Sequence, residues 1–257
     1  LEMGMRHGTL IAVVDGENIE ITTFRSKQEN GVIGYGISIE EDLRLRDFTL
    51  NAIAFSFATF KLVDPCSGIV DLSHELLKTP GDPTERLSED PLRILRMIRF
   101  GPAQGRSVDR RCLEAAKALG PSLRAVSVER IRVELEKILL CDHPREAFRL
   151  IRDLELLEFT IPEMIPSIGV EQNDFHYEDV FEHTLTVIER SPRERLMRWI
   201  GLFHDLGKPA TLSTDEEGRR HFYGHEKVSE NMALEAMQRL KFSNNDIKTI
   251  ASVVLHH

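Results

Sequence analysis

The sequence predicts an α+β protein in which a strand-rich front is followed by a helical rear. Short apolar runs on either side of the turn signal Asp15-Gly16 are typical of strands. After Gly81-Asp82-Pro83 the apolar residues recur with a helical period, and proline and glycine punctuate the pattern. Strands gathered at one end and helices at the other indicate an α+β head followed by all-helical domains.

The front is expected to hold the strands. Residues 9–14 and 18–24 are the arms of a predicted hairpin, and residues 26–38 are a Gly-rich polar loop. Residues 39–51 are predicted to begin a helix or turn. The runs NAIAFSF and KLVD that follow are expected to be further strands.

The rear is expected to be helical throughout, with helices separated by proline and glycine. The predicted helices cover residues 88–101, 109–119, 127–140, 144–156, 179–190, 193–206, 225–241 and 243–255. No internal repeat or low-complexity tract is found.

Composition is that of an ordinary globular protein. The 257 residues suffice for a substantial core and for two or more domains. Three widely spaced cysteines, in no CxxC arrangement, argue against a disulfide framework and against a thiolate zinc site. No apolar run approaches the roughly 20 residues that cross a bilayer, and no signal peptide opens the chain, so we expect a cytoplasmic protein without membrane contact.

A basic segment stands out within this acidic chain. The net charge of −9 argues against polyanion binding by the whole surface, yet residues 86–111 hold seven arginines against three acids. On the predicted helix, Arg93, Arg96 and Arg99 share one face with Asp90. A solvated stripe, with Glu89 paired to Arg93, would explain them on a generic helix. Aligned guanidinium groups repel one another, however, and a triphosphate or RNA backbone would relieve that repulsion.

Five segments in fixed order carry a family pattern. They are MRHGTLIAVVDGENIEITTFR (5–25), RLRDFTLNAIAF (44–55), LVDPCSGIVDL (62–72), GDP (81–83) and EDPLRILRMIRF (89–100). With the neck-like SVERIRVELEKIL (127–139), they resemble the class II tRNA nucleotidyltransferases, the bacterial CCA-adding family that also includes poly(A) polymerases. The resemblance implies a polymerase-β-like head with a small mixed sheet at residues 1–85, a helical nucleotide-recognition, neck and tRNA-binding region at 86–160, and a helical HD domain at 161–257.

The resemblance also implies nucleotide-binding residues. In the family's RRDFTxNA motif, Arg46, Asp47 and Asn51 would hold the incoming CTP or ATP, with Asp47 at the ribose, while Leu45 stands where the family has arginine. In the family's EDxxR motif an acid and an arginine recognise cytosine or adenine without a nucleic-acid template. The matching residues are Glu89, Asp90 and Arg93, with Arg96 and Arg99 as further nucleotide-binding arginines.

Such enzymes transfer a nucleotide to an RNA 3′-hydroxyl with two Mg²⁺ ions held by carboxylates. The family's Gly-Gly and Asp-x-Asp elements precede the strand that contains Arg6-His7-Gly8-Thr9, so we expect the main carboxylates before Leu1. Glu20 is a candidate supporting catalytic acid, and the polar face of an edge strand explains it equally well. The segment 26–40 is shorter than the corresponding loop of CCA-adding relatives and lacks arginine, which suggests either CC-only addition or omitted residues. Full CCA, CC-only, A-only and poly(A) addition all stay open.

A histidine constellation occupies the rear. His183, the pair His204-Asp205, His225 and the pair His256-His257 lie on predicted helices, where buried imidazoles need polar partners. Imidazoles and a carboxylate bind a divalent transition metal that activates water. The pattern resembles the HD phosphohydrolase superfamily, which implies His183, His204, Asp205, His225 and His256 as ligands of Mn²⁺, Ni²⁺ or Fe²⁺. It also implies phosphatase or phosphodiesterase activity, with a retained structural metal as the alternative, and a further Asp expected beyond His257.

Five arginines are candidates for contacts with the tRNA backbone. They are Arg110, Arg111, Arg124, Arg130 and Arg132. Ordinary surface ion pairs would explain about half of them equally well. The leading hypothesis is a template-independent nucleotidyltransferase acting on tRNA with CTP and ATP. The alternatives are an HD phosphohydrolase with a nucleotide-sensing head and an RNA-binding module without catalysis. The oligomeric state cannot be read from the sequence.

Overall fold

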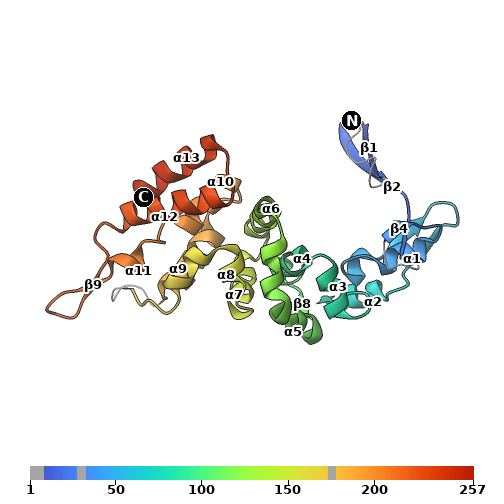
Figure 1. Cartoon of the computed structure of the whole chain (residues 1–257), viewed down its shortest axis with the longest axis horizontal. Helices are drawn as coiled ribbons and strands as arrows, with labels where there is room; N and C mark the ends of the chain where they lie inside the picture. The colour runs from blue at the N-terminus through green and yellow to red at the C-terminus, as the bar shows by residue number, and fades with distance from the viewer. Residues whose placement is uncertain (1–8, 28–32, 173–177) are drawn as a thin grey trace. The chain divides into compact units, whose positions relative to one another are not determined.

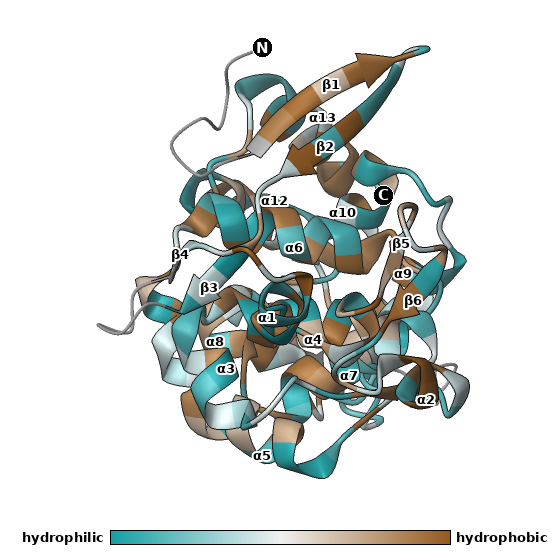
Figure 2. Cartoon of the chain, turned by 90° about the vertical axis from the view of Figure 1, so that its right-hand side faces the viewer, coloured by the Kyte–Doolittle hydropathy of each residue, from teal (hydrophilic) through white to brown (hydrophobic). Residues whose placement is uncertain are grey.

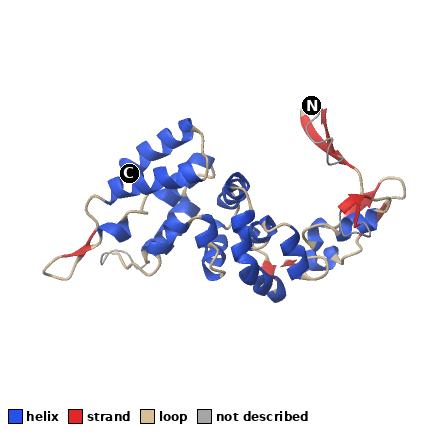
Figure 3. Ribbon diagram, in the orientation of Figure 1, coloured by secondary structure: helices blue, strands red, loops and turns tan. Residues whose placement is uncertain are grey.

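The computed structural model describes residues 9–27, 33–172 and 178–257, and the chain divides into two compact units, Leu1–Arg86 and Leu87–His257 (Figure 1). Strands gather in the first unit and helices make up most of the second (Figure 3), which confirms the α+β fold class. The expected boundary at 85/86 lies next to this division, whereas no division falls at 160/161. Residues 5–8 of the first motif and 28–32 of the expected loop lie outside the described residues.

The strands of the first unit pair locally. The ribbons are β1 (Thr9–Val14) with β2 (Glu17–Thr22), β3 (Arg25–Lys27) with β4 (Ile33–Tyr35), and β5 (Ala54–Ser56) with β6 (Lys61–Val63), each antiparallel. A further short strand is β7 (Leu76–Leu77). Among the described residues of the head, the expected small mixed sheet is therefore replaced by separate two-stranded ribbons, and part of the expected loop 26–38 is strand.

The predicted hairpin of β1 and β2 is confirmed. Asp15 and Gly16 have φ angles of 51° and 85°, the left-handed conformation that a tight two-residue hairpin turn requires. Apolar residues run along this ribbon (Figure 2), and the side chains of Leu10, Val13 and Ile21 are about half exposed. The ribbon thus leaves much apolar surface in contact with solvent.

Short helices form the core of the head. Helix α1 (Ile39–Arg44) is capped by the Ser38 hydroxyl, and the turn predicted after it contains a 3₁₀ helix, η2 (Thr49–Asn51). Helix α2 (Gly68–Ser73) packs against η2, and Phe48 between α1 and η2 is fully buried.

All eight helices predicted for the rear are present, with shorter ends. They are α4 (Leu92–Phe100), α5 (Arg110–Leu119), α6 (Val128–Leu139), α7 (Pro144–Asp153), α9 (Val180–Arg190), α10 (Arg195–Phe203), α12 (His225–Arg239) and α13 (Asn244–Leu255). Shorter elements are α3 (Pro83–Glu89), α8 (Leu157–Thr160), α11 (Lys208–Thr211), the 3₁₀ helices Pro102–Gln104, Gly120–Ala125 and Pro162–Ser167, and the strands β8 (Ser107–Val108), β9 (Ser213–Thr214) and β10 (Arg220–His221). No helix in the described ranges is long and apolar enough to cross a membrane.

The helix predicted over 88–101 is interrupted at Pro91. Helix α3 ends at Glu89 and α4 begins at Leu92, because proline has no N–H and disfavours a helical conformation of the residue before it. Asp90 is therefore not part of either helix; its Oδ1 accepts a hydrogen bond from the Leu92 N–H at 3.2 Å.

The second unit has a continuous helical core. Helix α4 packs on α6 and α7, α6 packs on α10, and α10 also contacts α9, α12 and α13. The fully buried Trp199 of α10 meets Phe242 edge to face, with ring centroids 5.0 Å apart. This packing fixes the helices that carry the histidines.

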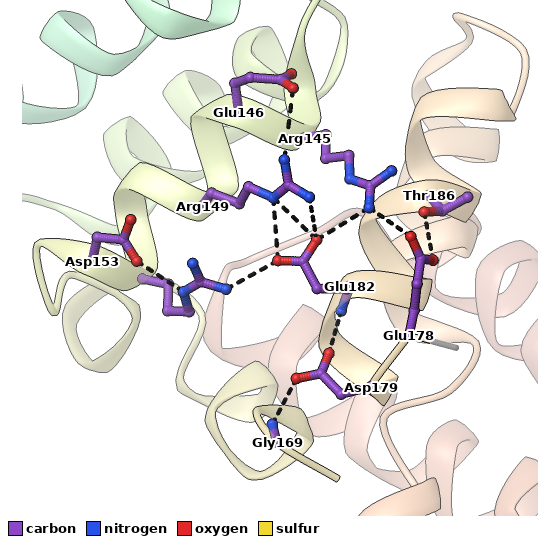
Figure 4. A network of polar contacts seen from close by, with 10 residues as sticks. Arg145, Glu146, Arg149, Asp153, Gly169, Glu178, Asp179, Glu182 and Thr186 are labelled. Atoms are coloured by element: carbon purple, nitrogen blue, oxygen red, sulfur yellow. Dashed lines mark hydrogen bonds and ion pairs between the residues drawn. The ribbon is translucent and has the colours of Figure 1, made fainter. Parts of the chain in front are cut away.

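Three arginines of α7 converge on one glutamate of α9 (Figure 4). Glu182 receives Arg149 Nη2 at 2.8 Å, Arg152 Nη1 at 3.0 Å and Arg145 Nη2 at 3.3 Å. Burial raises the pKa of the Glu182 carboxyl, but the arginines outweigh burial and hold that pKa below its usual value. The network ties α7 to α9 through charge-assisted hydrogen bonds.

Replacing Glu182 with glutamine is expected to lower the free energy of unfolding of the second unit by about 2–3 kcal/mol at pH 7. Because the pKa of Glu182 is depressed in the folded protein, its stabilisation is complete above the unfolded value of 4.5 and is lost as pH falls through the folded value. Urea unfolding followed by the fluorescence of the single tryptophan, Trp199, measures this. The difference between the two proteins should shrink below pH 4.5; an unchanged difference down to pH 3 would contradict the assignment.

Candidate functional sites

A cluster of four imidazoles surrounds Asp205 in the second unit. The Nε2 atoms of His183 and His204 lie 3.3 and 3.0 Å from Asp205 Oδ2, and those of His225 and His257 lie 3.3 and 3.6 Å from Oδ1. Two overlapping groups of these residues have ligand atoms close enough to share a metal ion. We call these five residues the histidine centre.

Gly207 allows the elements of the centre to approach one another. His204 ends α10, and the chain then turns so that the Gly207 N–H donates to Ser229 Oγ of α12 at 2.9 Å. A Cβ on Gly207 would lie 2.5 Å from the His225 carbonyl oxygen. Only glycine therefore lets the segment after Asp205 contact the start of α12, which brings His225 to the carboxylate.

The hydrogen bonds of the rings fit a metal site. The Nδ1 atoms of His204, His225 and His257 lie 2.7–2.8 Å from the carbonyl oxygens of Gly201, Phe222 and Val254. A carbonyl only accepts, so each Nδ1 carries a hydrogen, and in a neutral ring Nε2 then presents its lone pair to Asp205. Lone pairs facing a carboxylate are unfavourable unless a cation lies between them, so these residues fit a divalent metal.

The electrostatics of Asp205 point the same way. The carboxylate is 2% exposed, Lys208 Nζ lies 2.7 Å from Oδ2, and that oxygen accepts no hydrogen bond of normal geometry. Burial raises the pKa of Asp205, but the imidazoles of His183, His204 and His257, where their Nε2 atoms carry a proton, hold that pKa well below its usual range. Without a cation the carboxylate in turn raises the pKa of His257. Lys208 balances part of this buried charge, and protons on the imidazoles or a metal ion would stabilise it further.

The structure places His257, not His256, in the centre. Ile250 and Val254 form the buried face of α13, and His257 continues that face three residues on. His256 lies outside this phase of the helix, and its Nδ1 lies 2.7 Å from the Ser252 carbonyl oxygen. The phase of α13 thus brings His257 to Asp205 in place of the expected ligand His256. Lys208 is a further residue of the site that was not expected. Its position three residues after Asp205 is the sequence signal that could have predicted this contact.

The head brings three predicted nucleotide-binding residues together. Arg46 Nη2 lies 2.7 Å from Asp42 Oδ2, and Asp47 Oδ1 accepts hydrogen bonds at 3.0 Å from Asn51 Nδ2 and from the Phe48 N–H. Burial raises the pKa of Asp42, but hydrogen bonds from Arg25 and Arg46 outweigh it and lower that pKa. Asp42, which no sequence motif singles out, therefore holds Arg46 in place.

Leu45 is buried in the head core, 7% exposed. At the position where the family has an arginine, this chain therefore has a packed apolar side chain.

Two of the three arginines of α4 pair with acids of the second unit. Arg93 pairs with Glu89 at 2.8 Å, and Arg99 pairs with the buried Glu134 of α6 at 2.7 Å. The Arg96 guanidinium lies 5.3 Å from the centre of the Phe100 ring. The expected i,i+4 pair of Glu89 and Arg93 is thus present, and a tertiary contact with Glu134 balances the charge of Arg99, so less of the repulsion is left for an external anion to relieve.

Asp90 is also held in place. Its Oδ2 accepts a hydrogen bond from Arg130 Nη2 of α6 at 2.8 Å. Asp90 and Arg93 thus lie on either side of Pro91, with a carboxylate anchored by Arg130 and a guanidinium anchored by Glu89.

The candidate RNA-binding arginines make contacts within the chain. Arg110 pairs with Glu114 and Arg124 with Glu158, at 2.8 and 2.6 Å, and both pairs are well exposed. Arg132 Nη1 donates to the Lys241 carbonyl at 2.8 Å, and the Arg111 N–H donates to Asp109. Exposed ion pairs such as Arg110–Glu114 and Arg124–Glu158 contribute little stability, so these arginine side chains can exchange partners at small cost.

The candidate acid of the head has no metal-binding neighbours among the described residues. Glu20 is exposed on β2 opposite Ile11, and both groups of candidate metal ligands found in the described ranges belong to the histidine centre. The described head residues therefore do not form a Mg²⁺ site around Glu20.

Three protein families match successive parts of the chain. They are the Poly A polymerase head domain at residues 1–78, the probable RNA and SrmB-binding site of polymerase A at 107–168, and the HD domain at 175–257. The last of these contains the whole histidine centre.

Curated relatives agree with these families. The chain is 34% identical over 231 residues to an A-adding tRNA nucleotidyltransferase of Deinococcus radiodurans, covering 86% of this chain and 52% of the relative. It is 32% identical over 262 residues to a multifunctional CCA protein of Actinobacillus pleuropneumoniae, covering 93% and 61%. The chain thus spans about half the length of the curated relatives it matches.

A solved structure has the same fold. The Bacillus stearothermophilus CCA-adding enzyme in complex with CTP aligns with a TM-score of 0.72 and 25% identity, over 100% of this chain and 55% of that one.

Proposed function

We propose that this chain, which belongs to the tRNA nucleotidyltransferase and poly(A) polymerase family and has an HD domain, is of the CCA-adding type and adds C, A or both to tRNA 3′ ends, using CTP and ATP. The observation that carries the proposal is the anchored pair at the Pro91 break. Asp90 offers acceptor atoms and Arg93 offers donors from one turn, a combination that can read the edge of a cytosine or an adenine. Amino acids would then replace a nucleic-acid template.

Other residues would hold the rest of the substrates. Asp47 and Asn51 bind each other and would orient the ribose, while Arg46 would contact the phosphates. Arg96 and Arg99 would add positive charge from α4. Arg110, Arg111, Arg124 and Arg132 would contact the tRNA backbone, and Arg130 would do so with those donors that it does not use to hold Asp90. Mg²⁺ would activate the attacking 3′-hydroxyl; the described head residues do not gather its ligands, so Glu20 remains a candidate only.

The decisive experiment uses the natural full-length protein with Mg²⁺ and a tRNA transcript that ends at the discriminator base. CTP alone and CTP with ATP are supplied, and the 3′ ends are read at single-nucleotide resolution. We expect Arg93→Ala to lower incorporation about 100-fold, since two or more hydrogen bonds to the base are lost. Arg193→Ala, at an exposed ion pair with Asp142 to which no substrate contact is assigned, is the matched control. No incorporation by the wild type would overturn the transferase assignment, and normal incorporation by Arg93→Ala would overturn the role of Arg93 in base recognition.

We further propose that the HD domain is a metal-dependent phosphohydrolase, since four imidazoles converge on one buried carboxylate. The donor set suits Mn²⁺, Ni²⁺ or Fe²⁺, which would supply an activated water. His183, His204, Asp205, His225 and His257 would hold the ion. Lys208 would stay beside Asp205 and offer its ammonium group to a phosphate.

A further inference from the structure

A cavity of about 350 Å³ adjoins the histidine centre. Its wall includes Lys208 from the start of α11, Arg220 and His221 from β10, Tyr223, and His225 from the start of α12. His225 belongs both to this wall and to the histidine centre. A ligand in the cavity would therefore reach the atoms that bind the metal.

The cavity is suited to an anion. Lys208 Nζ donates to Gln172 Oε1 at 2.8 Å and Arg220 Nη1 donates to the Gln172 carbonyl at 3.3 Å, so one residue holds both cations. Lys208 is mostly buried beside Asp205, whereas Arg220 is 39% exposed and also pairs with Glu171. One carboxylate, Glu226, lines the same wall. Two fixed cations beside a metal site match the charge and oxygens of a phosphate.

The same wall presents an aromatic surface. The rings of His221 and Tyr223 stack with an interplanar angle of 9° and centroids 5.1 Å apart. Asp215 Oδ2 lies 2.8 Å from His221 Nε2 and holds the imidazole ring of the stack, while Tyr223 is 78% exposed. A large aromatic ring kept in one orientation yet left to solvent is a surface on which another flat ring can stack at little cost in side-chain entropy.

We propose that this cavity is a nucleoside-phosphate subsite, in which the Tyr223–His221 stack binds the base and Lys208 with Arg220 binds the phosphate. This inference rests on the proposed phosphohydrolase function, because it places the phosphate beside the histidine centre. It adds that the HD site selects substrates by their base. A phosphate ester without a base would use only the cationic half of the cavity.

Binding and turnover test the subsite separately. Adenosine 2′-, 3′- and 5′-monophosphates and ribose 5-phosphate are titrated calorimetrically into the metal-free full-length protein, and their hydrolysis is measured after loading with Mn²⁺. We expect at least one adenosine monophosphate to bind about tenfold more tightly than ribose 5-phosphate, as stacking on one aromatic ring provides. Tyr223→Ala should remove that preference and Tyr223→Phe should keep it. The control is Tyr35→Ala, at a similarly exposed tyrosine of the head.

The outcomes separate this inference from the proposed function. If no nucleotide binds more tightly than ribose 5-phosphate, or if Tyr223→Ala keeps the preference, the subsite is wrong even when the protein hydrolyses phosphate esters. If the loaded protein hydrolyses none of the four compounds but Tyr223→Ala still abolishes selective binding, the subsite stands and the phosphohydrolase proposal falls.

Discussion

Replacing Asp205 with asparagine is expected to lower the affinity of the histidine centre for Mn²⁺ at least about 100-fold. The carboxylate is the one anionic member of the cluster and lies within 3.6 Å of all four Nε2 atoms. Asparagine keeps its size but removes the charge that attracts the cation. Metal content by mass spectrometry and Mn²⁺ titration of the stripped protein measure the loss. Wild-type protein should also gain thermal stability with Mn²⁺, because the ion binds the folded state, and the variant should not.

Two adjacent histidines provide the matched control. His257→Ala removes a ring whose Nε2 faces Asp205, while His256→Ala removes an exposed ring that contacts only its own helix in the described contacts. We expect His257→Ala to weaken Mn²⁺ binding and His256→Ala to leave it unchanged. Equal behaviour of the two variants, or tight stoichiometric binding by Asp205→Asn, would refute the metal assignment.

Elements whose conformation depends on neighbouring residues could be predicted from the sequence. Asp15-Gly16 can adopt positive φ angles, so the hairpin and its register follow from two residues. The eight long helices follow from apolar periodicity. Asp90 was placed wrongly because the periodicity was followed through Pro91, although proline itself signals a break.

Partners that are distant in the sequence could not be predicted. Arg99 and Glu134 are 35 positions apart, and Asp90 and Arg130 are 40 apart, so only the packing of α4 on α6 reveals that these charges are balanced. The histidine motif predicted which residue types gather, but not that His257 follows the buried face of α13 and His256 does not. Nor did the composition, with three tyrosines, suggest the ring stack formed by Tyr223.

Replacing Gly68 with alanine is expected to lower the free energy of unfolding of the head by about 3 kcal/mol or more. A Cβ at this position would lie 2.1 Å from the Thr49 carbonyl oxygen and 2.7 Å from its carbon, and backbone atoms cannot move aside as a flexible side chain can. This close approach joins the motif at residues 44–55, which contains Thr49, to the motif at residues 62–72, which contains Gly68. It is reinforced by Thr49 Oγ1, which donates to Asp71 Oδ2 at 2.8 Å, and by the Gly68 N–H, which donates to Asp64 at 2.7 Å.

Two spectroscopic signals can locate the effect. Trp199, the single tryptophan, lies in the second unit, so its fluorescence follows that unit while far-ultraviolet circular dichroism follows both. We expect Gly68→Ala to shift the circular-dichroism transition to lower urea and to leave the fluorescence transition in place. Ser67→Gly is the control, since Ser67 has a φ of 59° that glycine adopts without strain, and it should stay within about 1 kcal/mol of wild type.

Nucleotide addition by the full-length Gly68→Ala protein then connects packing to function. Thr49 lies two residues from both Asp47 and Asn51, so moving its backbone would displace the pair proposed to orient the ribose. Incorporation should fall while Mn²⁺ binding at the histidine centre is retained, because the latter depends only on the second unit. Loss of both would show that the damage is global, and unchanged incorporation would show that Asp47 and Asn51 do not position the nucleotide.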